Sequence, residues 1–265
     1  MEGEFERATR VRSRGGGLYD ADIPAGWDIA GNANGGYLIA LAARAMIDAT
    51  GRPPLSLTAH YLAPGRPGPC DVSVDLVRVG RRTATASARL RSHGVDSLAL
   101  LGTFGEQGAP GPLFIGTEPP DLPPIDQCVR AKPPGGEAVS GFGDRVVVRI
   151  DPADAGFRLG EPSGRPEISG WFEFTDHQRT DELGLLLVAD AFAPVCFNVP
   201  SVPVGWTPTL ELTVHVRGVP EPGPLRCRFR SRCLQAGLFE EDGEIWDAGG
   251  ALVAQSRQLA LLPRG

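Results

Sequence analysis

Asp190 is the residue whose place in the sequence most strongly suggests chemistry. It follows Leu183, Leu186 and Leu187 at helical spacing, so a helix through this segment would carry the carboxylate on a leucine face. A buried carboxylate without a partner is costly, and it either finds hydrogen-bond donors or takes up a proton. Two interpretations stay open: a structural carboxylate that a nearby turn satisfies, or a functional acid or base.

Gln258 and Thr209 are the next candidates, and both fall in segments that alternate like β-strands. Thr209 opens a strand in which its side chain is expected on the face opposite Leu210 and Leu212; alone, it is an ordinary strand threonine. Gln258 is a large polar side chain on a face of small and apolar residues, where it can bind a water or a carbonyl group or satisfy the main chain. The other members of that face are Leu252, Ala254, Ser256, Ala260 and Leu262.

The segment Asn34, Gly35 and Gly36 precedes a long apolar stretch and predicts a helix start. Glycine lets a ligand approach the main chain closely, and the N–H groups of a helix start favour developing negative charge; tight packing of helix against sheet is the alternative. The spacing lacks the pattern of a phosphate loop, and no GxSxG motif exists for a serine nucleophile. His60 recurs in an internal repeat as His215.

Composition narrows the possible functions. The net charge of −6 argues against binding to nucleic acid, which needs a basic surface. Five scattered cysteines without a CxxC pair indicate reduced thiols, and four histidines without paired spacing indicate that there is no metal site. No signal peptide is recognisable, and the longest apolar run, 183–197, is too short to span a membrane and contains Asp190. We expect a cytoplasmic protein without a cofactor.

Two similar halves are expected around these candidates. Residues 55–60 resemble 210–215, and residues 67–69 match 222–224 at the same distance of 155 residues, which indicates a duplication. Glycine and proline concentrate between the halves. We therefore predict an N-terminal half over 1–105, a connector over 106–144 and a C-terminal half over 145–265.

Each half is predicted to be one helix followed by four antiparallel strands, which is an α+β arrangement. The first helix is expected from residue 37 to about Gly51 and the second from Thr180 to about Ala193, where Pro194 should end it. One or two further strands are expected between residues 5 and 23. The strands after the helices are predicted near 54–63, 70–79, 82–92 and 95–104, and near 208–217, 225–234, 238–247 and 251–262.

The order of several short motifs resembles the TesB-type acyl-CoA thioesterases, closest to the actinobacterial thioesterase-like members. The resemblance covers nearly the whole chain apart from the connector. It is carried by Trp27 and by residues 31–37, 57–62, 64–65, 79–81, 188–191, 209–213 and 252–258.

The resemblance implies a tandem (double) hotdog fold, in which an antiparallel sheet wraps a long central helix twice over. It also implies hydrolysis of acyl-CoA by water without a covalent intermediate, with Asp190, Thr209 and Gln258 as catalytic residues that hold the water. The helix start at Gly35 and Gly36 would then polarise the thioester carbonyl. In full, the candidate substrate-binding residues are Asn34, Gly35, Gly36 and His60.

Two other functions stay open. One is a non-catalytic acyl-CoA binding protein that kept the fold, and the other is a hotdog hydratase or dehydratase acting on an enoyl or hydroxyacyl thioester. The expected partners are acyl-CoA and further copies of the chain, because hotdog sheets leave edges that usually pair, giving a homodimer or a larger homo-oligomer. The nature of the acyl group does not follow from the sequence.

Overall fold

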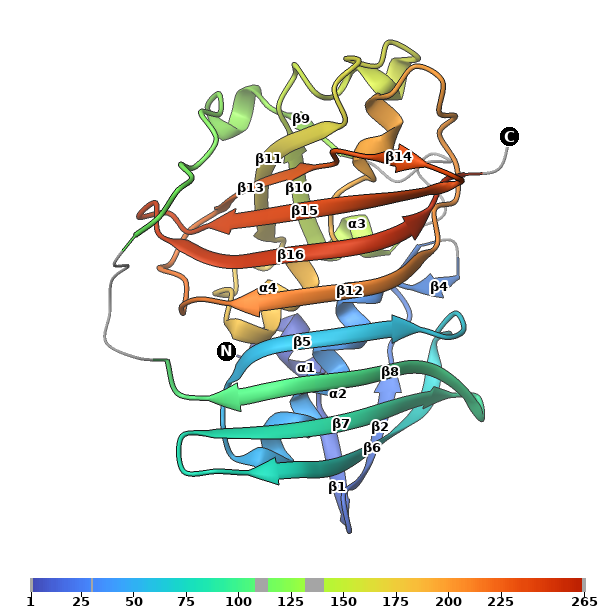
Figure 1. Ribbon diagram of the computed structural model, residues 1–265, viewed down its shortest axis with the longest axis vertical. Helices are drawn as coiled ribbons and strands as arrows, with labels where there is room; N and C mark the ends of the chain where they lie inside the picture. The colour runs from blue at the N-terminus through green and yellow to red at the C-terminus, as the bar shows by residue number, and fades with distance from the viewer. Residues whose placement is uncertain (1, 30, 108–113, 132–140, 264–265) are drawn as a thin grey trace.

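The computed structural model describes residues 2–29, 31–107, 114–131 and 141–263. Its main feature is one continuous antiparallel sheet that runs the length of the molecule, with helices α2 and α4 behind it in the view of Figure 1. The order of the strands along the sheet is β1-β2-β6-β7-β8-β5-β12-β16-β15-β13-β11-β10-β9, and β14 (Leu234–Gln235) pairs with β15. The tandem hotdog arrangement expected from the sequence is therefore present.

The first half is built around α2 (Gly35–Thr50), which is rich in alanine and leucine and is buried along most of its length. The Asn34 side chain caps its start by accepting a hydrogen bond from the Tyr37 amide, and Gly51 ends it in the left-handed conformation, at φ 66°. The strands of this half are β1 (Val11–Gly15), β2 (Leu18–Ile23), β5 (Pro54–Tyr61), β6 (Gly68–Val79), β7 (Thr83–Ser92) and β8 (Val95–Gly105). The short elements are α1 (Glu4–Ala8), β3 (Asp28–Ile29) and β4 (Asn32–Ala33).

The second half repeats this series of strands in mirror order about the centre of the sheet. Its strands are β10 (Val146–Ile150), β11 (Glu167–Phe174), β12 (Thr209–Val216), β13 (Leu225–Arg230), β15 (Leu238–Trp246) and β16 (Leu252–Leu261). The eight strands predicted after the helices are all present, and β1 and β2 are the two expected before α2. Strands β10 and β11 had not been predicted. The short elements are η1 (Ile125–Gln127), β9 (Val129–Arg130), α3 (Phe142–Arg145), η2 (Gly156–Leu159) and η3 (Val195–Asn198).

The two halves meet where β5 pairs with β12. Thr58 lies opposite Thr213, and their hydroxyl oxygens are 2.9 Å apart. These two threonines are equivalent in the repeat, so an approximate two-fold axis passes between them. The predicted boundaries of the halves stay predictions, although within the connector β9 pairs with β10 and so continues the sheet of the second half.

The helix of the second half is shorter than predicted. Helix α4 spans Glu182–Val188 and does not continue to Ala193. In a longer helix the carbonyl of Asp190 would need an N–H donor four residues later, where Pro194 has none. The carbonyl instead accepts a hydrogen bond from Asn34 Nδ2, at 2.9 Å, which holds Asp190 in a turn against the start of α2.

Candidate active site

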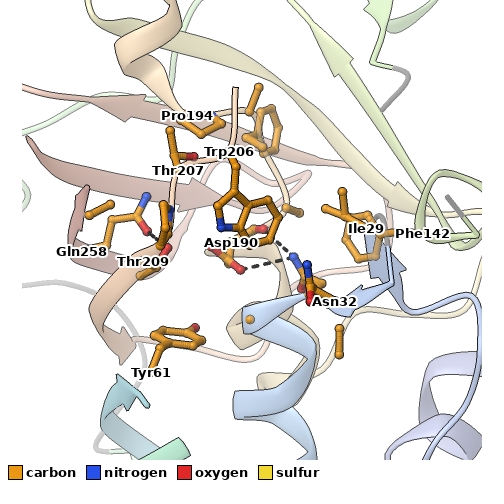
Figure 2. Close-up of a pocket in the computed structure, with 18 of the residues that line it drawn as sticks. Ile29, Asn32, Tyr61, Phe142, Asp190, Pro194, Trp206, Thr207, Thr209 and Gln258 are labelled. Carbon is orange, nitrogen blue, oxygen red and sulfur yellow. Dashed lines mark hydrogen bonds between the residues drawn. The ribbon is translucent and has the colours of Figure 1, made fainter. Parts of the chain in front are cut away.

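A cavity of about 500 Å³ lies between the two halves (Figure 2). Its walls are largely apolar, and its polar side chains come from both halves, among them the start of α2, the end of β5, the turn after α4 and the strands β12, β15 and β16. Its lining residues include Asn34, Gly35, Tyr61, Asp190, Trp206, Thr209, Glu241 and Gln258.

Asp190 is held by donors from the other half of the molecule. Its Oδ2 accepts hydrogen bonds from the Gly36 amide at 3.0 Å and from Asn34 Nδ2 at 3.2 Å. Asn34 therefore has two functions, because its Oδ1 caps α2 while its Nδ2 binds both the side chain and the main chain of Asp190. The carboxylate is thus fixed at the positive end of α2.

The glycine pair at the start of α2 makes this contact sterically possible. A Cβ on Gly36 would lie 2.8 Å from the carbonyl oxygens of Leu186 and Leu187 in α4. A Cβ on Gly35 would lie 2.6 Å from Tyr61 Oη and 2.8 Å from Asp190 Oδ2. These distances are shorter than real Cβ contacts. At Gly36 the contacts are main chain of α4, so the two helix ends can approach this closely only with glycine there, whereas at Gly35 they are the side chains of Tyr61 and Asp190.

The ionisation of Asp190 is set by opposing effects. Burial raises its pKa to about 6, although hydrogen bonds from the Gly36 and Gly35 amides pull the value down. At neutral pH the carboxylate is therefore mostly ionised, and a proton that it accepts is bound more tightly than by an exposed aspartate. Such a group is suited to act as a general base.

Thr209 lies on the side of the sheet that the alternation of β12 did not predict. The pairing of β12 with β16 shifts register between Thr209 and Glu211, so this β-bulge turns Thr209 toward the cavity. Its hydroxyl donates to Gln258 Oε1 at 3.1 Å. Gln258 is 7% exposed on the inward face of β16, where its alternation had placed it.

Glu241 and Tyr61 are polar residues of the cavity that sequence reasoning did not single out. Glu241 on β15 lies opposite Gln258 and is 5% exposed; Oε1 accepts from Gln258 Nε2 at 2.7 Å and Oε2 accepts from the Val195 amide at 2.9 Å. The alternation contained a signal, because outward positions for Glu240 and Asp242 require an inward one for Glu241. The Tyr61 hydroxyl is buried beside Gly35 and has no hydrogen-bond partner among the described residues.

Burial also shapes the protonation of these two groups. It raises the pKa of Glu241 to about 7, with smaller contributions from the charges of Asp190 and Asp242, against the lowering effect of the Val195 amide and Gln258. Burial and the nearby negative charges raise the pKa of Tyr61 well above its ordinary value, so its hydroxyl stays protonated.

The structure differs from two expectations about substrate contacts, one for His60 and one for the Gly36 amide. His60 is exposed on β5 and does not line the cavity, where it had been expected to bind substrate. The Gly36 amide, expected to polarise a carbonyl, donates to Asp190 instead, so the start of α2 stabilises a side-chain carboxylate. Within the described residues there is no cluster of three or more potential metal ligands. None of the described helices is long and apolar enough to cross a membrane.

Comparisons with known proteins agree with this architecture. The acyl-CoA thioesterase N-terminal domain matches residues 23–105, and the acyl-CoA thioesterase C-terminal domain matches residues 124–262. A crystal structure of a proposed thioesterase II from Thermobifida fusca is 30% identical, with 99% of this chain and 98% of that chain covered and a TM-score of 0.89.

Two mycobacterial proteins are also similar, one in sequence and one in structure. An uncharacterised protein of Mycobacterium tuberculosis is 28% identical, over 93% of this chain and 91% of its own length. The acyl-CoA thioesterase II TesB2 from Mycobacterium marinum has the same fold, with a TM-score of 0.73 at 18% identity and 98% of both chains covered. The two domain matches together cover most of the chain, in the order in which the two halves form the sheet and the cavity between them. The chain therefore belongs to the acyl-CoA thioesterase family, in its TesB-like double-hotdog form.

Proposed function

We propose that this protein hydrolyses acyl-CoA to a free acid and CoA by the attack of a water molecule that Asp190 activates. The observation that carries the proposal is the position of Asp190: a carboxylate with a raised pKa, fixed by Asn34 and Gly36, in a cavity between the halves. Water would add its oxygen to the thioester carbon, the C–S bond would break, and the proton taken by Asp190 would pass to the departing thiolate.

The polar side chains around Asp190 can hold such a water. One of its hydrogens would bond to Asp190 and the other to a lone pair of Thr209. Gln258 keeps one amide hydrogen beyond its bond to Glu241, and this hydrogen can donate to the water oxygen. The remaining lone pair of the water would then face the thioester carbon. The Tyr61 hydroxyl is buried without a partner among the described residues, so it can donate to the carbonyl oxygen.

The cavity walls support an apolar acyl group as the part of the substrate that enters. They are formed mainly by aliphatic and aromatic side chains, and Asp190 and Glu241 are the acidic residues among those described. Trp206 is 57% exposed while it lines the cavity, which is the arrangement of a residue at the entrance. The CoA portion would remain outside this apolar space.

The alternatives differ in what they require of the site. A hydratase or dehydratase of this fold would use a histidine with an acid, and none of the four histidines of the chain, all of them among the described residues, lines the cavity. A non-catalytic binding protein would need no carboxylate beside the thioester. Cytoplasmic location and assembly into a homodimer or larger homo-oligomer stay predictions.

The test is a hydrolysis screen over saturated acyl-CoAs of graded length, following the released CoA thiol. We expect turnover with at least one chain length, and in Asp190→Asn we expect kcat to fall at least 100-fold while KM changes little. Asp96→Asn, at the exposed ion pairs with Arg89 and Arg91, serves as the matched control and should keep full activity. Unchanged turnover in Asp190→Asn contradicts the assigned role, and tight acyl-CoA binding without hydrolysis favours the binding protein.

A further inference from the structure

Glu241 is a buried carboxylate of the cavity that the proposed mechanism leaves without a role. It has no cationic partner among the described residues, and it lines the cavity while bonding to Gln258. A buried carboxylate of this kind destabilises the fold relative to an uncharged residue of the same shape. Gln258 bonds to Thr209 at one end of its amide and to Glu241 at the other. The benefit that offsets the cost of burying Glu241 can therefore lie in how it orients Gln258.

The hydrogen-bond chain through Glu241 has a fixed direction. The Val195 N–H can only donate, so Glu241 Oε2 must accept. With Glu241 ionised, Oε1 must accept too, so Gln258 turns its amide nitrogen to Glu241 and its oxygen to Thr209. Thr209 must then donate its one hydrogen to Gln258 and can face the cavity only with lone pairs.

We propose that Glu241 is a positioning residue, whose carboxylate orients the Gln258 amide so that Thr209 faces the cavity as a hydrogen-bond acceptor. The inference rests on the proposed function, in which Thr209 accepts one hydrogen of the attacking water. If Glu241 takes up a proton, Oε1 can donate instead, Gln258 can turn over, and Thr209 can become the acceptor within the chain. Its hydrogen is then directed toward the water and competes with the productive orientation.

The groups around Glu241 make this protonation relevant near neutral pH. Asp190 in the turn after α4 and Asp242 on β15 are the carboxylates that act on it, and both favour its protonated form. Cys196 of η3 also lies near Glu241. Burial, and to a lesser degree the charge of Glu241, raises the pKa of that thiol to about 12, so Cys196 stays neutral. The charge on Asp242 is offset by its ion pairs with Arg257 and Arg232.

The variant Glu241→Gln tests the inference directly, because the Val195 N–H determines which way the new amide faces. Its single oxygen must accept from Val195, so its nitrogen points to Gln258, which must present its own oxygen. The direction of the chain is thereby reversed at unchanged shape. We expect kcat to fall 10- to 100-fold with KM changed less than threefold. The matched control is Glu244→Gln on the same strand, a buried carboxylate that pairs with Arg228 and does not line the cavity.

A double-mutant cycle with Thr209→Val shows whether Glu241 acts through Thr209. If it does, Glu241→Gln should change kcat less than threefold once the hydroxyl is absent. In the pH profile, kcat of Glu241→Gln should begin to fall at a lower pH than kcat of the native enzyme does, because the protonation of Glu241 near pH 7 is removed. Full kcat and an unshifted limb in Glu241→Gln, or an equal loss in the Thr209→Val background, would overturn the proposal.

The side-chain amide signals of Gln258 test the same point without turnover. In an NMR titration of the full chain we expect these signals to shift as the pH falls through about 7, and not to shift in Glu241→Gln. Hydrolysis by the native enzyme and its loss in Asp190→Asn decide the proposed function separately. If the Gln258 amide signals do not shift near pH 7, or shift equally in Glu241→Gln, the positioning role is overturned even in a fully active thioesterase.

Discussion

At the scale of single residues, Asp190 combines catalytic suitability with a cost to stability. Its folded pKa of about 6 lies above the ordinary value of 3.8, so the folded chain binds this proton more tightly than the unfolded chain does. The free energy of unfolding must therefore fall as the pH rises from about 4 to about 6, and it stays reduced above that range. Glu241 lowers the free energy of unfolding in the same direction as the pH rises, because its folded pKa is about 7 and its ordinary value is 4.5.

Asp190→Asn should accordingly be more stable than the native chain at pH 8 while losing activity. The asparagine oxygen can still accept from Gly36, and the charge that burial penalises is gone. We expect a gain of about 2 kcal/mol in the free energy of unfolding at pH 8. The gain should disappear near pH 4, where the native carboxyl is protonated too. Urea denaturation at both pH values measures it, and equal stability of the two chains at pH 8 would contradict the raised pKa.

The sequence located much of this site for reasons that are only partly right. Asp190 was singled out on the assumption that a helix continues through it, whereas it lies in a turn beyond α4. Its burial next to leucines was still informative, because the turn keeps it against the same core. Thr209 was assigned to the wrong face, since strict alternation presumes a regular register and the bulge next to Leu210 breaks it.

At the scale of elements, the contact between the start of α2 and the end of α4 determines the geometry of the site. Asn34, Gly36 and Asp190 are bonded to one another only because the two helix ends are this close. The sequence predicted the helix start at the glycine pair, but not which element it would meet. That information lies in the pairing of the halves, which no local pattern encodes.

Gly36→Ala should therefore disturb stability and activity together. The added methyl group would lie 2.8 Å from two main-chain carbonyl oxygens of α4, and main chain cannot rotate away as a side chain can. We expect a loss of about 2–4 kcal/mol in the free energy of unfolding and a marked loss of kcat. Gly218→Ala is the control, because its nearest contact would be at 3.8 Å. Native stability and turnover in Gly36→Ala would show that the helix ends need not be so close.

The repeat predicted more of the fold than any single element. It implied that equivalent strands would occupy equivalent places, and Thr58 and Thr213 indeed pair across the centre of the sheet. The repeated motifs begin at residue 210 in the second half, so they give no signal for β10 and β11, the counterparts of β1 and β2, which lie before it.

At the scale of the whole molecule, the two halves share structure that neither can complete alone. The ladder between β5 and β12 joins the sheets, α2 packs on α4, and the cavity takes its walls from both halves. Separating them would leave the edges of two strands unpaired and would remove the donors of Asp190. A duplicated chain of this kind differs from two domains on a linker, in which each half would have its own core.

Unfolding should consequently be a single cooperative transition. Trp27 lies in the first half and the other three tryptophans lie in the second, so a Trp27→Phe chain reports on the second half alone by fluorescence. In that background, Val72→Ala removes a buried contact on β6, far from the junction, and should cost about 2 kcal/mol. We expect it to lower the Tm seen by the second-half tryptophans by about 4–8 °C, as much as the matched Val253→Ala on β16 does.

Calorimetry provides a second measurement of the same cooperativity, and it should give equal calorimetric and van't Hoff enthalpies. A second-half transition that Val72→Ala leaves unmoved would instead mean that the halves unfold independently, and that the shared strands and the Asp190 contacts add little to the stability of either.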